Sequence, residues 1–171
     1  MTKRLFLLAL LLLFSTVFVF PDSNQELISL QSLLKTHTKK NYSINELKNL
    51  KEFNLIGNNH TTLPQAIGQL KNLEKLDLEN NKLTALPQAI GQLKNLKELY
   101  LSENNLTTLP QAIVQLKNLE TLYLGFNKLT TLPQAIVQLK NLKELYLSGN
   151  KISLKERERI NKLLPRCNIV F

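Results

Sequence analysis

The stretch LPQAIGQLKNLKELYLSENNLTTL, at residues 86–109, is one of several close copies of the same sequence. Its opening LPQAI recurs at 63–67, 109–113 and 132–136, so the chain repeats itself every 23 residues. Self-similarity at a fixed period of this length is typical of a solenoid, in which stacked coils bury together what one coil cannot bury alone. The repetition therefore decides the fold.

Each column of the repeat predicts a structural role. Aligned coils read L-x-x-L-x-L-x-x-N-x-L-T-x-L-P-x-x-I-x-x-L-K-N. In LEKLDL at 73–78 the leucines alternate with polar residues, which predicts a strand with one buried face and, from coil to coil, a parallel sheet. The asparagine column is predicted to hydrogen-bond the turns of neighbouring coils. It comprises Asn58, Asn81, Asn104, Asn127 and Asn150. The proline of each coil is predicted to open a short helical turn.

This pattern, from about Ser43 to the C-terminus, resembles the leucine-rich repeat family. The resemblance implies an α/β repeat solenoid, with a curved parallel sheet on the concave side and short helical or 3-10 turns on the convex side. A helical N-terminal cap and a helix-plus-strand C-terminal cap are expected, since a solenoid end would otherwise expose its leucines.

The chain divides into four predicted parts. Residues 1–22 are interpreted as a signal peptide, 23–42 as a capping helix and loop, 43–153 as about five repeats, and 154–171 as the C-terminal cap. In this last part, LPRCNI at 164–169 is predicted to be a sixth strand with Cys167 and Ile169 pointing inward.

The first part has the features of an export signal. Lys3 and Arg4 precede an apolar run from Leu5 to Phe20, which is shorter than the roughly 20 residues that span a bilayer. Cleavage near residues 20–25 would give an exported protein, secreted or at the cell surface or outer envelope. Without cleavage the segment would be a membrane anchor, with a periplasmic or membrane-anchored protein as the result.

The candidate binding surface is the exposed side of the sheet. Counted from the first leucine of each coil, its third, fifth and seventh columns project outward. Tyr100, Tyr123 and Tyr146 form an aromatic stripe there, and Phe126 lies close by. Tyrosine is a favoured interface anchor. The predicted partner-binding residues are Tyr100, Tyr123, Tyr146, Asp77, Glu79, Glu98, Glu144 and Phe126.

Charge is predicted to be unevenly distributed. The three columns hold five acids against Lys75 and Arg166, a balance of 2 − 5 = −3, whereas the whole chain carries +9. The second column alternates Lys and Glu, which should pin the stacking. A lysine at one place per coil, from Lys48 to Lys140, is interpreted as a solubility feature, because no aromatic or arginine residues interleave with it as nucleic-acid contacts would need.

Nothing in the sequence indicates an enzyme, a cofactor or a metal site. His60 occupies a column otherwise held by Leu and Ile, which favours a near-core role. Cys167, the single cysteine, is interpreted as a small buried hydrophobe, with an interchain disulfide as the alternative.

The coils also resemble exported leucine-rich repeat proteins of leptospires, which are generally taken to bind host proteins. The resulting expectation is an exported, non-enzymatic, monomeric protein-binding scaffold that uses its concave face, with a role in host interaction or adhesion. Its protein partner is unknown, no nucleic acid is expected, and a membrane is involved only if the N-terminal segment is uncleaved. The alternative is an envelope-associated structural protein, held by that segment or by its basic outer surface.

Overall fold

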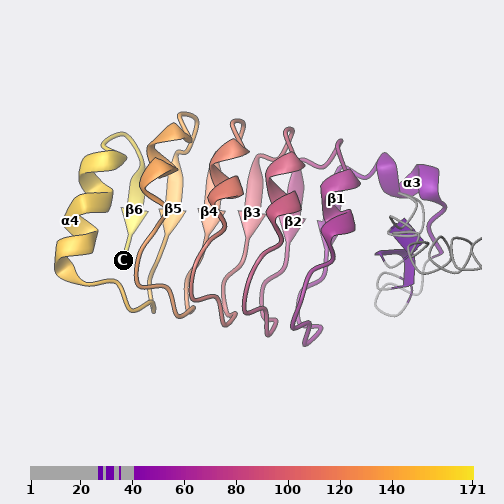
Figure 1. Cartoon of the computed structure of the whole chain (residues 1–171), viewed down its shortest axis with the longest axis horizontal. Coiled ribbons are helices and arrows are strands. Elements are labelled where there is room, and N and C mark those ends of the chain that lie inside the picture. Colours follow the sequence, from indigo (N-terminus) through magenta and orange to yellow (C-terminus); the bar gives the residue numbers. More distant parts are fainter. Residues whose placement is uncertain (1–26, 29, 33–34, 36–40) are drawn as a thin grey trace, which may run out of the picture.

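Six parallel strands, one from each coil, form a single sheet in chain order (Figure 1). The computed structural model describes residues 27, 28, 30–32, 35 and 41–171. The strands are β1 Glu52–Asn54, β2 Lys75–Asp77, β3 Glu98–Tyr100, β4 Thr121–Tyr123, β5 Glu144–Tyr146 and β6 Asn168–Val170. The solenoid that the 23-residue period predicts is confirmed. The predicted signal peptide, and most of the predicted N-terminal capping helix, lie outside the described residues.

Short 3-10 helices form the opposite wall of the solenoid and lie in front of the strands in Figure 1. They are η1 Gln65–Gln69, η2 Gln88–Gln92, η3 Gln111–Gln115 and η4 Gln134–Gln138. Proline immediately precedes each helix rather than being its first residue: Pro64 is extended (φ −68°, ψ 152°) and its carbonyl accepts from Ile67 N at 3.1 Å. The extended proline thus turns the chain into the helix and supplies its first acceptor.

Leucine fills the space between the two walls. Leu76, Leu99 and Leu122, at the centres of successive strands, are fully buried, as are Ile90 and Leu93 from the helical side. Each buried side chain of this size contributes roughly 1.5–3 kcal/mol relative to exposure. The repeat therefore builds one continuous core along the solenoid axis.

The predicted asparagine column is an internal hydrogen-bond ladder. Asn104 Nδ2 donates to Leu78 O of the preceding coil at 2.9 Å and to Leu101 O at 3.1 Å, while its Oδ1 accepts from Leu83 N at 3.0 Å. Asn81, Asn127 and Asn150 bond in the same way. In the described residues, Asn58 of the first coil bonds only Ile56 O, at 3.0 Å. The ladder thus satisfies turn groups that cannot pair within the sheet.

A second asparagine ladder runs along the outside and was not predicted. The asparagine of each Lys-Asn pair donates from Nδ2 to the carbonyl of the lysine one coil earlier. The donors are Asn72, Asn95, Asn118 and Asn141, at 2.8–3.0 Å. The repeated K-N dipeptide was the available signal.

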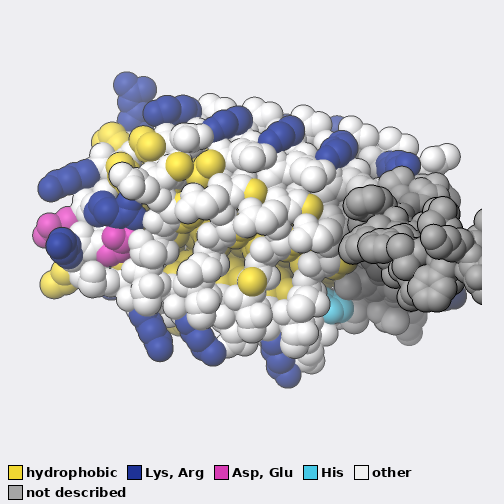
Figure 2. Space-filling view, in the orientation of Figure 1, with side chains coloured by type: hydrophobic (Ala, Val, Ile, Leu, Met, Phe, Trp, Pro, Cys, Tyr) yellow, Lys and Arg dark blue, Asp and Glu magenta, His cyan; other side chains and the backbone are white. Residues whose placement is uncertain are grey.

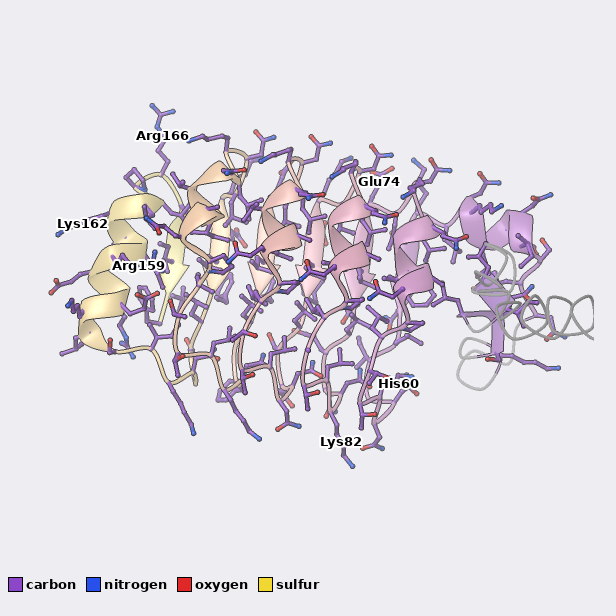
Figure 3. All side chains as sticks on the ribbon, viewed as in Figure 1. His60, Glu74, Lys82, Arg159, Lys162 and Arg166 are labelled. Atoms are coloured by element: carbon purple, nitrogen blue, oxygen red, sulfur yellow. The ribbon has the colours of Figure 1, made fainter. Side chains whose placement is uncertain are left out.

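The register of the last strand differs from the prediction by two residues. Asn168 pairs with Glu144, Ile169 with Leu145 and Val170 with Tyr146. Leu164 O accepts from Cys167 N at 3.1 Å, the bond that Leu139 O makes with Leu142 N, so Leu164 ends the outer segment instead of opening the strand. The ten-residue helix α4, Leu154–Leu163, replaces a five-residue 3-10 helix and shifts the coil. Arg166 consequently leaves the sheet face and lies in the turn beyond α4 (Figure 3).

The N-terminal end is covered by helical residues. Leu27 and Leu30 are helical and fully buried. Helix α3, Ile44–Lys48, follows a capping box in which Ser43 Oγ accepts from Glu46 N and Glu46 Oε2 accepts from Ser43 N. The S-x-x-E sequence was the missed signal for it. Within the described residues, no helix has the length and apolar character that spanning a membrane requires.

Glu156 ties helix α4 to the repeats. Its carboxylate accepts from Arg159 at 2.5 and 2.7 Å, from Thr131 Oγ1 at 2.6 Å and from Leu132 N at 3.2 Å. Hydrogen bonds from Arg159 and Thr131 outweigh burial and lower the pKa of Glu156 to about 2. Helix α4 is therefore held to the last repeats by the hydrogen bonds of the Glu156 carboxylate as well as by burial of Ile160.

We expect this contact to make the cap acid-sensitive. A carboxyl whose pKa is lowered on folding stabilises the protein above its unfolded pKa, and the stabilisation is lost as pH falls toward the folded value. Unfolding free energies measured by urea from pH 6 to pH 2.5 should show wild type losing roughly 2 kcal/mol more than Glu156→Gln. Glu158→Gln, an exposed change on the same helix, should follow wild type. Parallel curves for wild type and Glu156→Gln would contradict this assignment.

Candidate functional site

The three predicted tyrosines form a stacked column on the exposed side of the sheet. We call this side the sheet face and define it as the third, fifth and seventh repeat columns along β1–β6. Tyr100 and Tyr123 have ring centroids 4.9 Å apart with planes at 12°, and Tyr123 and Tyr146 lie 4.2 Å apart at 6°. The strand register places the three side by side. The structure therefore brings them together into one half-buried aromatic stack, in which the faces of the middle ring are covered by its two neighbours.

Hydroxyl groups give this aromatic surface a polar edge. Tyr100 Oη donates to Glu98 Oε2 at 2.8 Å, and Tyr123 Oη to Glu144 Oε2 at 3.4 Å. Burial and the bond to Glu98 raise the pKa of Tyr100, and burial together with Tyr146 raises the pKa of Tyr123 to about 12. Both hydroxyls are donors at neutral pH.

The predicted acids lie around the stripe with different exposures. Glu98 is ion-paired with Lys75, 3.5 Å away, and Lys75 Nζ also lies 4.8 Å from the centroid of Tyr100. Asp77 is only 8% exposed, and burial raises its pKa, opposed by its bond from Glu79 N. Glu79 and Glu144 are half-buried. Because Arg166 leaves the face, five acids stand against Lys75 alone, a balance of 1 − 5 = −4.

Phe126 stands at the rim of the sheet face in a strained conformation. It is 64% exposed and has a positive φ of 52°, which bulky residues rarely adopt. Its ring lies against Gly149, where an added Cβ would come within 2.6 Å of Phe126 Cδ1. The same repeat column, the eighth, has positive φ in every coil, at Gly57, Asn80, Glu103, Phe126 and Gly149. Its glycines were a sequence signal for this turn.

We expect Phe126→Asn to stabilise the fold by about 0.5–1 kcal/mol, since asparagine tolerates the left-handed region and the exposed ring buries little. Asn80 adopts φ 52° at the equivalent place, which makes asparagine the matched choice. Urea unfolding followed by circular dichroism measures the change. A loss of stability would mean that packing of the ring on Gly149 outweighs the strain. An exposed aromatic kept under strain is a feature of binding surfaces.

The second repeat column and the lysine row carry charges that bond within the protein. Glu74 bonds both Lys51 and Lys97, and Glu120 bonds Lys143 at 2.5 Å, so the second column pins the coils as predicted. The lysine row is engaged as well. Lys71, Lys94 and Lys117 donate to the glutamine side chain of the next coil at 2.7–3.1 Å.

The remaining candidates are not part of this surface. His60 is half-buried, and its backbone N–H donates to Asn81 Oδ1 at 2.9 Å. Cys167 is partly rather than fully buried, because the shifted register places it before β6. Burial and nearby Glu144 raise its pKa to about 11, which keeps the thiol protonated at neutral pH. In the part of the chain that the structure describes, no three His, Cys, Asp or Glu side chains gather to hold a metal ion.

Comparison with known proteins agrees with this architecture. A model described as leucine rich repeat matches residues 71–129 and 94–152. A leucine-rich repeat protein of Leptospira interrogans is 48% identical over 75% of this chain and 38% of its own, with a TM-score of 0.64. An internalin of Listeria monocytogenes is 24% identical over 74% of this chain and 36% of its own, with a TM-score of 0.60. No curated protein matches the chain.

A parallel sheet backed by 3-10 turns, with stacked asparagines between coils, defines a solenoid scaffold, a class that generally binds proteins and is generally non-enzymatic. This chain belongs to the leucine-rich repeat family and is similar to a leptospiral member. It spans little more than a third of the length of the two solved relatives.

Proposed function

We propose that this chain is an exported protein-binding scaffold whose sheet face, centred on Tyr100, Tyr123 and Tyr146, contacts a protein partner. The stacked tyrosine column carries the proposal. Three rigid, half-buried rings present apolar area at low entropic cost, and their hydroxyls add directional hydrogen bonds. Phe126, strained and exposed at the rim, extends the same surface.

Export is supported by the sequence of residues 1–22, and contact with host proteins is what the resemblance of the coils to exported leptospiral leucine-rich repeat proteins implies. The intact mass of the protein isolated from its native cells tests whether it is exported. A chain beginning near residues 20–25, found in the medium or at the surface, supports export. A full-length chain in the inner membrane contradicts it.

We expect replacement of the three tyrosines by serine to weaken partner binding at least tenfold, because an interface depends on a few central aromatic anchors. Immobilised wild type, the tyrosine variant and a control would capture proteins from host extracellular matrix for quantitative mass spectrometry. The control is Gln88→Ser with Gln111→Ser and Gln134→Ser, three exposed residues of the 3-10 helices. Proteins retained by wild type and control but lost by the tyrosine variant are the expected result. Equal capture by all three excludes the sheet face.

A further inference from the structure

We propose that the sheet face binds an extended protein segment rich in lysine and arginine, which rests on the proposed function and specifies the chemistry of the partner. The face is acidic on a basic molecule, with a balance of −4 against +9 for the chain. Figure 2 shows the opposite side, where Lys and Arg lie along both edges and the Asp and Glu gather near α4. The two sides of the solenoid thus differ in charge.

The acids of the face lack the compensation that neighbouring acids have. Glu74 and Glu120, one column away, each bond a lysine of an adjacent coil. Over residues 41–171, the only acid of the sheet face with an ion pair is Glu98. Glu52, Asp77, Glu79 and Glu144 have none there. A partner that supplied cations would complete these pairs.

Lys75 shows how this surface holds a cation. Its ammonium lies 3.5 Å from Glu98 Oε2 and 4.8 Å from the ring centroid of Tyr100, so a carboxylate and an aromatic face act together. A cation placed between two such groups is held by both ion pairing and cation–π attraction. Glu144, whose Oε2 accepts from Tyr123 Oη at 3.4 Å, offers a second carboxylate two strands further on, while both ring faces of Tyr123 are covered by Tyr100 and Tyr146.

The third column has one place where its alternation of charge is broken. The strand register aligns Glu52, Lys75, Glu98, Thr121 and Glu144 in that order. Thr121 therefore stands where a lysine would continue the alternation, between two glutamates and beside Tyr123. Strands lie about 4.8 Å apart, so the two flanking glutamates are roughly 10 Å apart at the backbone, which leaves room for an incoming lysine or arginine.

The positive charge of the whole chain does not prevent this contact. Charges separated by more than about 8 Å are largely screened at physiological salt. The lysine row instead donates to glutamines of the helical wall. A cationic segment on the sheet therefore meets mainly the local acids and tyrosines. A stretch of peptide along six strands would cover roughly 24 Å.

A lysine at position 121 tests the inference, because the protein's own ammonium group would then fill the space between Glu98 and Glu144. The probe is a dye-labelled 12-residue peptide of alternating arginine and serine, with a glutamate-for-arginine peptide as its counterpart, measured by fluorescence anisotropy at 50 and 300 mM NaCl. Thr121→Lys should weaken binding of the arginine peptide at least tenfold, because its ammonium takes the place between Glu98 and Glu144. Gln111→Lys, with the same charge change on the helical wall, should stay within twofold of wild type.

Two results would overturn the inference: equal binding of both peptides by wild type, or equal loss from Thr121→Lys and Gln111→Lys. The capture experiment separates this failure from failure of the proposed function. Partners that depend on the three tyrosines but are retained by Thr121→Lys would leave the binding face in place and exclude a cationic partner segment. Unchanged circular dichroism confirms that each variant is folded.

Discussion

Asn104→Ala should lower the free energy of unfolding by about 3–5 kcal/mol, far more than a typical polar substitution. The side chain is 6% exposed and serves three buried backbone groups, namely Leu83 N, Leu78 O and Leu101 O. Each buried group left without a partner costs about 1–3 kcal/mol. The three costs do not add fully, since water enters the enlarged space, but together they form a large share of a marginal stability.

Asn58→Ala is the matched control for the internal ladder. Asn58 occupies the same column but, in the described part of the chain, bonds only Ile56 O of its own turn. Its loss should cost less than about 1 kcal/mol. Urea unfolding followed by circular dichroism and by tyrosine fluorescence measures both variants. Similar losses of unfolding free energy in the two variants would mean that the hydrogen bonds between coils add nothing to stability.

The second large effect is expected at Gly91, where valine should destabilise the fold by about 3 kcal/mol even though valine is a natural residue of this repeat column. Val114 and Val137 hold the place in later coils. At Gly91, however, a Cβ would come within 2.5 Å of Ala112 O and 2.9 Å of Ala112 Cβ. Backbone must move to admit it, so coils 2 and 3 approach more closely on the helical side than their sequences suggest.

Two substitutions complete the test of this close approach. Gly91→Ala adds only the clashing atom and should cost about 1–2 kcal/mol. Gly125→Ala adds an atom whose nearest neighbours are Ser148 O at 3.5 Å and Ser102 Oγ at 3.8 Å, ordinary contacts that should change stability by less than about 0.5 kcal/mol. Tolerance of valine at Gly91 would show that the coils can slide apart without cost.

These two effects bear on function because they set the rigidity of the sheet face. The asparagine ladder lies directly behind the turns that follow each strand, and the glycine contacts set coil spacing on the far wall. A tyrosine column stacked at 4.2–4.9 Å needs strands in fixed register. A preorganised surface loses less entropy on binding, which favours affinity.

The repeat predicted the architecture well because its columns follow physical periods. Alternating leucines such as Leu76 and Leu78 required a one-sided strand, and a constant 23-residue interval required in-register parallel pairing. That pairing was enough to predict the tyrosine column and the ion pairs of the second column. The partner-binding role of the predicted residues stays a prediction, since stacking and charge describe a surface and not what binds it.

Prediction failed where the repeat ended, and where a structural feature does not recur every 23 residues. The register of β6 depends on how helix α4 packs against the last repeats, and the lone LPRCNI segment fitted the strand pattern by coincidence. The left-handed conformation of Phe126 was missed because glycine holds its repeat column only in the first and fifth coils, at Gly57 and Gly149.

The sequence by itself thus determined the solenoid, its parallel sheet, its leucine core and its internal asparagine ladder, because these depend only on spacing along the chain. Only the tertiary structure decided the register of the last strand, the close contact at Gly91, the strain at Phe126 and the place of Lys75 between Glu98 and Tyr100. The physical reason is that these features depend on distances between atoms of neighbouring coils, which vary with each side chain and each cap while the period stays constant.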